Sequence, residues 1–272
     1  SLSSVDPRAR RAGPWLRGLW DELHAREPRL ARYGALLLAL MLPMALAWGL
    51  DDRMLRGVDI WIKPMKFALS IAVLAWTTAW FVGHLKASAR RRRAVDWIVW
   101  LLIGAGSFEL AYIVQQAGLG QASHYNESDL LHGVMYALMG VGAIVLTATQ
   151  PMLAWQLHRH GDTTRPAGLR LAVQLGLVLT FVLGAGTGIP LSSIQPPDAG
   201  AGSLPLLGWS LAGGDLRPAR FVGIHAEQAL PLLALAITRW RLPRPRAWVV
   251  AVTLGWLALF ALLMAWGLGL TG

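Results

Sequence analysis

The residues with the clearest chemical potential are ionisable side chains that lie inside otherwise apolar segments. His132 and His225 are candidate axial ligands of a haem iron, and with Glu109 they are candidate ligands of a divalent metal. Glu109 must be protonated, paired with a cation such as Lys66, or bound to a metal, because a lone charge is costly in an apolar segment. We therefore expect Glu109 and Lys66 to carry any catalysis.

Further polar residues share helical faces with these groups. Glu109, Tyr112 and Gln116 follow the spacing i, i+3, i+7, and the same spacing recurs from Asp129 to Tyr136. The candidate ligand-binding residues are Lys63, Tyr112, Gln116, His124, Asp129, Tyr136 and Gln228.

A structural role is the alternative for each group. The two lysines near residue 65 would then snorkel to the lipid headgroups, and Glu109 would form a structural ion pair with one of them. His132 would make a structural hydrogen bond. His124 would be a solvated loop residue, and Asp129 would be a helix-capping residue.

Long apolar segments predict an all-α integral membrane protein. The chain has 272 residues, of which 55% are hydrophobic and 15% charged, whereas a soluble domain has about 25% charged residues. Each apolar segment is close to the ~20 residues that cross a bilayer. We expect a seven-helix transmembrane domain over residues 33–270, with spans at 33–50, 58–84, 95–118, 128–155, 169–190, 218–239 and 247–269.

Local signals add detail to these spans. Pro64 and Pro231 are expected to perturb the second and sixth spans. Asn126 or Ser128 is expected to cap the fourth. Glycines such as Gly140 and Gly142 are expected to allow close helix packing.

Two regions lie outside the predicted spans. Residues 1–32 form a basic tail, in which Pro14 is expected to open an interfacial amphipathic helix with Trp20 and Leu23 on its apolar face; a disordered tail is the alternative. The longest connection, 191–217, is rich in Pro and Gly yet carries apolar residues. We expect it to fold over the mouth of the bundle as a lid.

The basic residues predict the orientation. Segments 1–32, 86–93, 158–170 and 239–246 hold 19 of the 25 Lys and Arg residues, which favours a cytoplasmic N-terminus and a periplasmic C-terminus. The net charge of +10 then indicates contact with anionic lipids on the cytoplasmic side rather than with nucleic acid. The candidate residues all fall in the outer half of the bilayer or near its midplane, which predicts one polar pocket that faces the periplasm.

Three sequence blocks carry a resemblance to a known group of proteins. They are WIKPMKFALS, GQASHYN and LPLLGWSLAGGDLR with FVGIHAEQALPLL. These blocks are similar to a family of uncharacterised bacterial seven-helix membrane proteins, from the second span to the sixth. The resemblance implies a bacterial inner-membrane location and a site formed by these blocks, but no particular activity.

Several function classes are excluded and three remain. The chain has no cysteine, which excludes disulfides and thiolate chemistry. The last span has no lysine for a retinal, and no phosphate-binding glycine loop is present. The remaining hypotheses are a protein that binds a metal, haem or small polar or anionic ligand for redox or hydrolytic chemistry, a proton-coupled transporter, and a non-catalytic sensor or assembly subunit.

Overall fold

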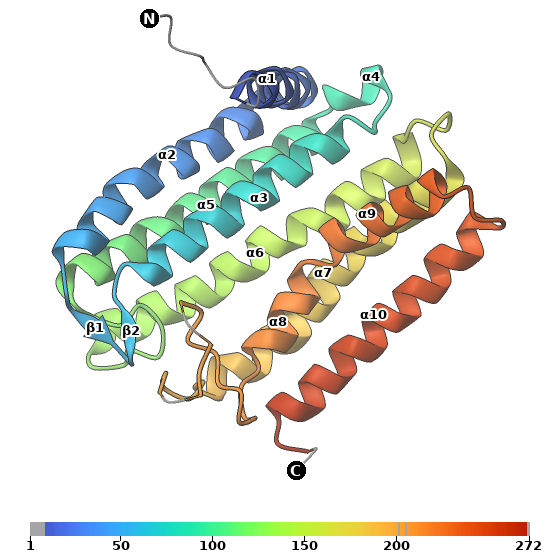
Figure 1. Cartoon of the computed structure of the whole chain (residues 1–272). Coiled ribbons are helices and arrows are strands. Elements are labelled where there is room, and N and C mark those ends of the chain that lie inside the picture. Colours follow the sequence, from blue (N-terminus) through green and yellow to red (C-terminus); the bar gives the residue numbers. More distant parts are fainter. Residues whose placement is uncertain (1–8, 201, 205, 271–272) are drawn as a thin grey trace, which may run out of the picture.

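The chain folds into a bundle of long helices, most of whose axes run along one common direction (Figure 1). The computed structural model describes residues 9–200, 202–204 and 206–270. The long helices are α1 (Ala9–Arg26), α2 (Pro28–Leu50), α3 (Ile62–Val82), α5 (Arg93–Leu119), α6 (Leu130–His160), α7 (Ala167–Ser193) and α10 (Pro245–Gly267). The shorter elements are α4 (Ala87–Arg90), α8 (Arg217–Ile224), α9 (Ala226–Arg239) and the antiparallel strands β1 (Met54–Leu55) and β2 (Val58–Asp59).

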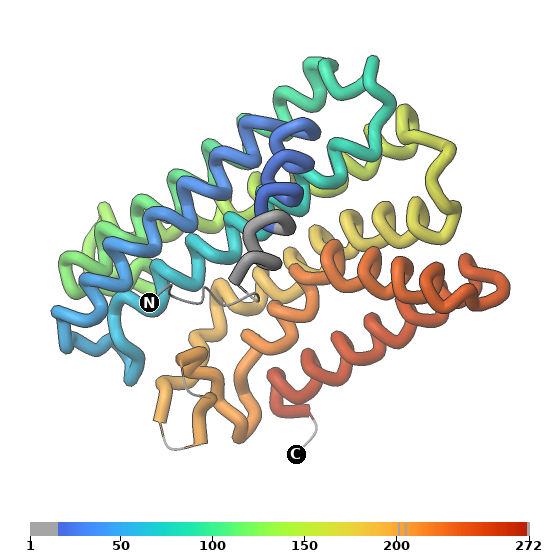
Figure 2. Tube along the Cα trace, turned by 45° about the horizontal axis from the view of Figure 1, so that its top comes forward, coloured from blue at the N-terminus to red at the C-terminus, as the bar shows by residue number. Residues whose placement is uncertain are grey.

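The prediction of a helical bundle with six or seven candidate membrane spans is confirmed. Six helices are long and apolar enough to cross a membrane, namely α2, α3, α5, α6, α7 and α10. A seventh span results if α8 and α9, which meet at an angle of 55°, are taken as one broken span. Figure 2 shows these two helices following one another along α7, with α10 beside them.

The expected position of the perturbation in the sixth span was wrong. The helix breaks at His225, and α9 continues through Pro231. At the break, the backbone N–H of Glu227 donates to Oγ1 of Thr180 (3.1 Å), and this hydroxyl donates to the carbonyl of Ile224 (3.3 Å). A threonine on α7 thus satisfies backbone groups that the helix itself leaves free, which a membrane interior requires.

Small residues allow the helices to approach one another. Gly142 on α6 is one: a Cβ there would lie 2.7 Å from Oε1 of Glu109 on α5. The prediction of close packing is therefore confirmed for Gly142. It was wrong for Gly140, which has no atom within 4 Å of a Cβ position because it faces outward from the bundle.

The second span begins later than expected, because residues 54–59 form the short β1–β2 hairpin. Asp59 lies in β2 and does not share a helical face with the lysines that follow it. Pro64 falls in the first turn of α3, where a backbone N–H has no partner within the helix, so the expected disruption was wrong. In the same way Asp129, rather than Asn126 or Ser128, caps α6 by accepting from the N–H of His132 (3.0 Å).

Helix α1 lies across the end of the bundle, against α2 and α3. It begins at Ala9, so Pro14 lies within it rather than at its start. Leu23 is buried, and the guanidinium of Arg26 lies 3.9 Å from the ring centre of Trp80 and donates to its carbonyl (2.8 Å). A helix is therefore present in the tail, whereas its position at a membrane interface stays a prediction.

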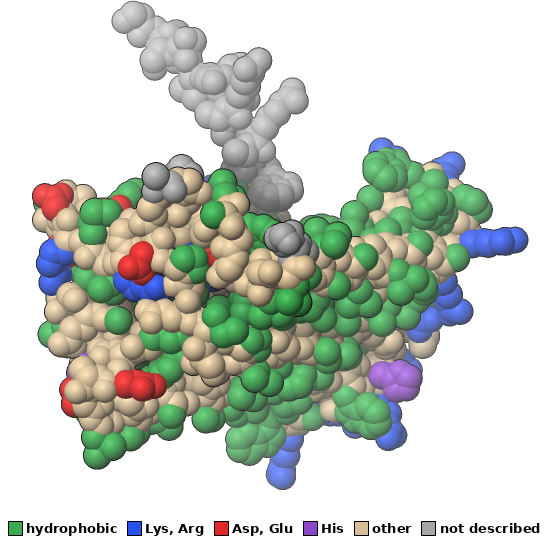
Figure 3. Space-filling view, turned by 90° about the horizontal axis from the view of Figure 1, so that it is seen from below, with side chains coloured by type: hydrophobic (Ala, Val, Ile, Leu, Met, Phe, Trp, Pro, Cys, Tyr) green, Lys and Arg blue, Asp and Glu red, His purple; other side chains and the backbone are tan. Residues whose placement is uncertain are grey.

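Charged side chains are sorted between the two ends of the bundle. In Figure 3, most of the visible Lys, Arg and His side chains lie at the right-hand end, whereas the visible Asp and Glu side chains lie at the left-hand end together with a few Lys and Arg side chains. The basic end is where α5 begins and α6 ends, and the acidic end carries the β1–β2 hairpin. Between the two ends, the apolar surface extends along the helices.

Candidate functional site

The candidate site is centred on a contact between Lys63 and His124 near the acidic end of the bundle. Lys63 lies in the first turn of α3, and His124 lies in the loop between α5 and α6. The Nδ1 atom of His124 is 3.2 Å from Nζ of Lys63 and also 3.2 Å from Oγ of Ser123. Burial lowers the pKa of His124 to about 3, and the charges of Lys63 and Arg220 add to this effect. The imidazole is therefore neutral at pH 7.

Glu109 supplies the carboxyl group of this site. It lies on α5, is only 3% exposed, and packs against Gly142. The cations whose charges act on it are Arg220 and Lys63. Its Oε1 atom has no hydrogen-bond partner in the part of the chain that the structure describes. The sequence suggested Lys66 as its cation, but Glu109 forms no ion pair with Lys66 in the described part of the chain, and the charge of Lys63 is the one from α3 that acts on it.

Arg220 is a member of the site that sequence reasoning missed. It lies in α8, near the start of the broken span, where its Nη1 donates to the carbonyl of Gly184 on α7 (3.1 Å). A Cβ on Gly188 would lie 2.8 Å from this nitrogen, so the guanidinium fits against bare backbone. The signal was present in the sequence as an arginine near the start of the predicted span 218–239, but no role in a site was predicted for it.

Two tyrosines close the site on the side of α7. Tyr125 donates to the carbonyl of Leu191, and Tyr136 donates to the carbonyl of Ser192 (2.9 Å). Their ring centres are 5.4 Å apart, and the ring of Tyr136 lies 6.0 Å from that of His124. Burial raises the pKa of Tyr125 to about 12, so it stays protonated. These contacts fix the α5–α6 loop to the end of α7.

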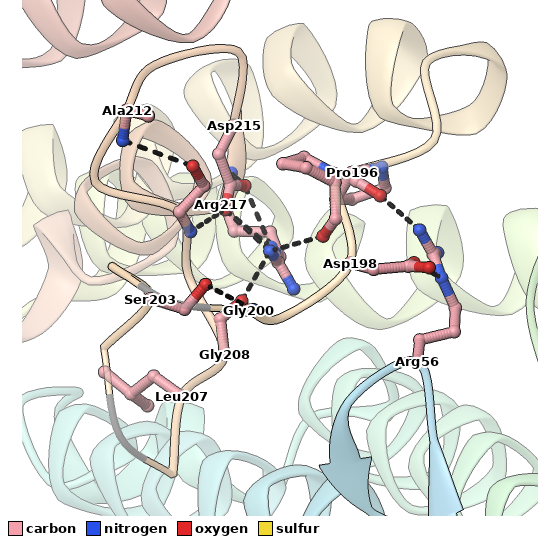
Figure 4. A network of polar contacts seen from close by, with 12 residues as sticks. Arg56, Pro196, Asp198, Gly200, Ser203, Leu207, Gly208, Ala212, Asp215 and Arg217 are labelled. Carbon is pink, nitrogen blue, oxygen red and sulfur yellow. Dashed lines mark hydrogen bonds and ion pairs between the residues drawn. The ribbon is translucent and has the colours of Figure 1, made fainter.

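The connection between α7 and α8 lies against the same region. Arg56 in the turn of the β1–β2 hairpin forms an ion pair with Asp198 and also donates to the carbonyl of Pro196 (Figure 4). Lys66 donates to the carbonyl of Leu207 (3.2 Å). The connection thus contacts both the hairpin and α3, whereas a lid function stays a prediction.

This connection has an internal ion pair of its own. Asp215 is fully buried, accepts from Nη2 of Arg217 (2.7 Å), and accepts from the backbone N–H of Ser210 (2.9 Å). Arg217 also donates to the carbonyl of Gly208 (2.8 Å), as Figure 4 shows. Asp215 therefore holds the segment before α8 in one conformation. The glycines that precede Asp215 in the sequence did not indicate this role.

The expected metal ligands are not brought together. His132 contacts Oδ2 of Asp129 (2.7 Å) and Oε1 of Gln121 (3.1 Å). His225 lies at the α8–α9 break, where its Nδ1 donates to the carbonyl of Phe221 (2.7 Å). Among the described residues, no group of three or more His, Asp or Glu side chains is placed to hold a metal ion. The set of His132, His225 and Glu109 thus lacks a common centre.

The remaining candidates lie on two faces. Tyr112 and Gln116 are buried on the same face of α5 as Glu109. Gln228 lies elsewhere, beside Glu227, and donates from Nε2 to the Glu227 carboxyl (2.9 Å) and to Oγ1 of Thr77 (3.3 Å). Glu227 is fully buried, and its Oε2 atom has no partner in the described part of the chain. No role was predicted from the sequence for this second intramembrane carboxyl.

The geometry supports anion binding more directly than acid–base catalysis. Lys63, Lys66 and Arg220 are half-buried, and none forms an ion pair in the described part of the chain. Their hydrogen bonds go to an imidazole nitrogen and to two backbone carbonyls. With Glu109 as the carboxylate among them, this cluster (hereafter the outer cluster) carries an excess of positive charge.

Comparison of the chain with protein-family models, with curated proteins and with solved structures found no match. The resemblance to a family of bacterial seven-helix membrane proteins therefore stays a prediction.

Proposed function

We propose that the chain is a multi-pass protein of the bacterial inner membrane whose outer cluster binds a small anionic ligand that carries a carboxylate or phosphate group. The observation that carries this proposal is the set of three half-buried cations, Lys63, Lys66 and Arg220, without an ion-pair partner in the described part of the chain. The N-terminus is cytoplasmic in this proposal, and the outer cluster faces the periplasm.

Electrostatics explains why an anion would be bound there. Half-buried positive charges without counter-charges are costly, and an anion placed between them lowers that cost. Arg220 offers a planar set of donors that matches a carboxylate or phosphate, and Lys63 offers a compact charge. If Lys63 donates to Nδ1 of His124, the neutral ring carries its proton on Nε2. That N–H is then a further donor for the ligand.

Chemistry on the bound ligand would fall to Glu109, which stands among these donors. A carboxyl group between two cations is suited to exchange a proton with a ligand atom. Lys66 would instead hold the connection between α7 and α8 in place, through its hydrogen bond to the carbonyl of Leu207. Of the candidate roles, this proposal keeps an acid–base role for Glu109 and gives Lys63 and Arg220 a binding role.

The orientation is supported by charge. Of the 19 Lys and Arg residues of the tail and of segments 86–93, 158–170 and 239–246, the 18 that lie within the described residues belong to the end of the bundle opposite the hairpin. The positive-inside rule places that end in the cytoplasm. The outer cluster then lies in the half of the membrane that faces the periplasm.

Binding is tested by thermal unfolding of the detergent-purified protein in the presence of inorganic phosphate, acetate, or tetramethylammonium as the cationic control. We expect at least one anion to raise the unfolding midpoint, and the cation to have no such effect. The variants Lys63→Gln and Arg220→Gln are expected to weaken anion binding tenfold or more. Lys86→Gln, which removes an exposed cation at the opposite end, is the matched control.

Two results would refute this proposal. One is an anion effect that persists unchanged in both Lys63→Gln and Arg220→Gln. The other is equal stabilisation by the anions and by tetramethylammonium. Either result would favour a purely structural cluster, such as a sensor or assembly subunit would have.

A proton-coupled permease is the second candidate, and the broken span favours it. Broken helices at the membrane midplane are a recurring feature of transporters, and the break at His225 is followed directly by Glu227, whose buried carboxyl accepts from Gln228 (2.9 Å). In this candidate, Glu227 carries the proton while the outer cluster holds the anion.

Proteoliposomes with a trapped pH-sensitive dye separate the two candidates. Addition of phosphate or acetate outside would acidify the lumen faster than in protein-free vesicles if the anion enters with a proton. Glu227→Gln would abolish this flux and leave anion binding in detergent intact. Binding without any protein-dependent acidification would leave the first candidate alone.

A further inference from the structure

A second charged site lies at the opposite, basic end of the bundle. A cavity of about 410 Å³ lies between the first turn of α5 and the last turns of α6. The side chains that define its chemistry are Arg92, Arg93, Trp155, Gln156, Arg159 and His160. Cavities of this size hold small molecules or parts of larger ones. It is far from the outer cluster, because α5 and α6 run the length of the bundle (Figure 1).

The arginines of this cavity lack acidic partners. Arg92 donates from Nη1 to Nε2 of His160 (2.9 Å), and the guanidinium of Arg159 lies 4.6 Å from the ring centre of Trp155. None of the three arginines forms an ion pair within the described residues.

The acidic groups nearest in sequence are engaged elsewhere. Asp96 pairs with Arg29 on α2 (2.7 Å), and Asp162 accepts from the hydroxyl of Thr164 (2.7 Å). The cavity therefore has three positive charges and no counter-charge.

Two further features favour a phosphate group as the ligand. Arginine guanidinium groups bind phosphate oxygens through paired donors. Helix α5, which is 27 residues long, begins beside the cavity at Arg93, and its N-terminus has no side-chain cap. The free N–H groups of that first turn add to the positive potential. The arginines and the helix end act on the same space.

Tryptophans indicate that this space lies at the level of lipid headgroups. Trp155 in the cavity wall and Trp97 and Trp100 on α5 are 55%, 64% and 58% exposed. Exposed tryptophans on spanning helices concentrate at the boundary between hydrocarbon and water. A basic cavity between helices at that boundary is suited to an anionic headgroup.

We propose that the cavity between α5 and α6 binds the phosphate group of an anionic lipid, with Arg92 and Arg159 as its main ligands. Gln156 lines the same cavity and supplies an amide donor. The acyl chains of this lipid would lie along the apolar outer surface of α6, where Met152 and Trp155 are exposed. The site would be specific for a negatively charged headgroup, because a zwitterionic lipid would add a cation to a cavity that already has three.

Native mass spectrometry of the detergent-purified protein tests this proposal. Equal amounts of phosphatidylglycerol and phosphatidylcholine are added, and the abundance of each bound lipid is measured. We expect phosphatidylglycerol to bind at least tenfold more than phosphatidylcholine. The double variant Arg92→Gln/Arg159→Gln is expected to lose this preference. Arg239→Gln/Arg241→Gln removes two exposed arginines at the same end and is expected to keep it.

Three outcomes would overturn the proposal. The first is an equal loss of preference in both double variants, which would indicate a diffuse charge effect. The second is an unchanged preference in Arg92→Gln/Arg159→Gln. The third is displacement of the bound lipid by inorganic phosphate at an equal concentration, which would indicate a site for soluble phosphate. If the double variant does not fold, the single variants Arg92→Gln and Arg159→Gln are compared with Arg239→Gln in the same way.

Discussion

The ammonium group of Lys63 lies 3.2 Å from Nδ1 of His124, so the imidazole faces a cation rather than a carboxylate. This contact joins the start of α3 to the α5–α6 loop. It also disfavours protonation of the His124 ring, because a protonated ring would place a second positive charge beside that of Lys63. Arg220 acts on the ring in the same sense, and Tyr136 and Ser123 are its uncharged polar neighbours. The neutral state of His124 is therefore a condition of the folded outer cluster.

A pH dependence of stability follows from this condition. The pKa of His124 is lowered to about 3 in the folded protein, mainly by burial, and is about 6.5 in the unfolded chain. Between these values the unfolded chain binds a proton that the folded protein does not. The free energy of unfolding is thus expected to fall by up to about 1.4 kcal/mol per pH unit as the pH drops below about 6. Well above pH 6.5, where the imidazole is neutral in both the folded and the unfolded state, His124 has no effect on the free energy of unfolding.

The measurement is the thermal unfolding midpoint in detergent from pH 5 to pH 8. His124→Gln is expected to show a shallower loss of stability in acid than the unchanged protein. Some loss will remain, because burial also lowers the pKa of His84 to about 4. His158→Gln replaces an exposed histidine at the opposite end and is the control. An acid slope that is the same in His124→Gln and in the unchanged protein would contradict the prediction.

The contact between Gly142 and Glu109 gives a second prediction. A Cβ at residue 142 would lie 2.7 Å from Oε1 of Glu109, whereas a Cβ at residue 140 would meet nothing within 4 Å. Gly142→Ala is therefore expected to lower the free energy of unfolding by about 1–3 kcal/mol. Gly140→Ala, on the same helix, should be neutral or stabilising because alanine favours a helix. Equal unfolding midpoints for the two variants would argue against the packing of Glu109 on α6.

The absence of cysteine from the chain makes a direct test of topology possible. Gly200→Cys lies in the connection before α8, and Thr163→Cys lies in the turn between α6 and α7; both positions are exposed. In intact bacterial cells, a membrane-impermeant maleimide is expected to label only the cysteine at position 200. Labelling of both positions before cell lysis, or of position 163 alone, would overturn the proposed orientation.

Hydropathy was sufficient to predict the bundle, because each span needs only length and apolar composition. It could not predict the break at His225, since this depends on the Thr180 hydroxyl of another helix. It also could not predict that Lys63 contacts His124 while Lys66 contacts the carbonyl of Leu207. Those contacts depend on the rotation of α3 about its axis, and a helix that is apolar on most sides gives little indication of its rotation.

The residues that make up the outer cluster show the same limit of prediction from the sequence. Arg220 was visible as a cation beside a predicted span, but its approach to Glu109 depends on a guanidinium that fits against Gly184 and Gly188 of α7. The face shared by Glu109, Tyr112 and Gln116 was predictable, because helical spacing alone decides it, and all three are buried. Contacts within one helix were thus accessible to sequence reasoning, and contacts between helices were not.

The break between α8 and α9 carries the last prediction. Gly176 on α7 lies so close to it that a Cβ there would be 2.8 Å from Cα of Glu227 and 2.9 Å from the carbonyl oxygen of Ala226. These are backbone atoms, which cannot rotate away as the end of a side chain can. Gly176→Ala is therefore expected to destabilise the protein more than Gly142→Ala does, and to separate Thr180 from the backbone groups at the break.

Gly186→Ala is the matched control for this substitution, because Gly186 lies on the same helix and has no atom within 4 Å of a Cβ position. The measurement is the thermal unfolding midpoint in detergent, together with hydrogen exchange of α9. Faster exchange at residues 226–230 in Gly176→Ala, but not in Gly186→Ala, is the expected result. If Gly176→Ala unfolds at the same temperature as Gly186→Ala, α7 does not hold the broken span in place, and the Thr180 contacts are not what stabilises the break.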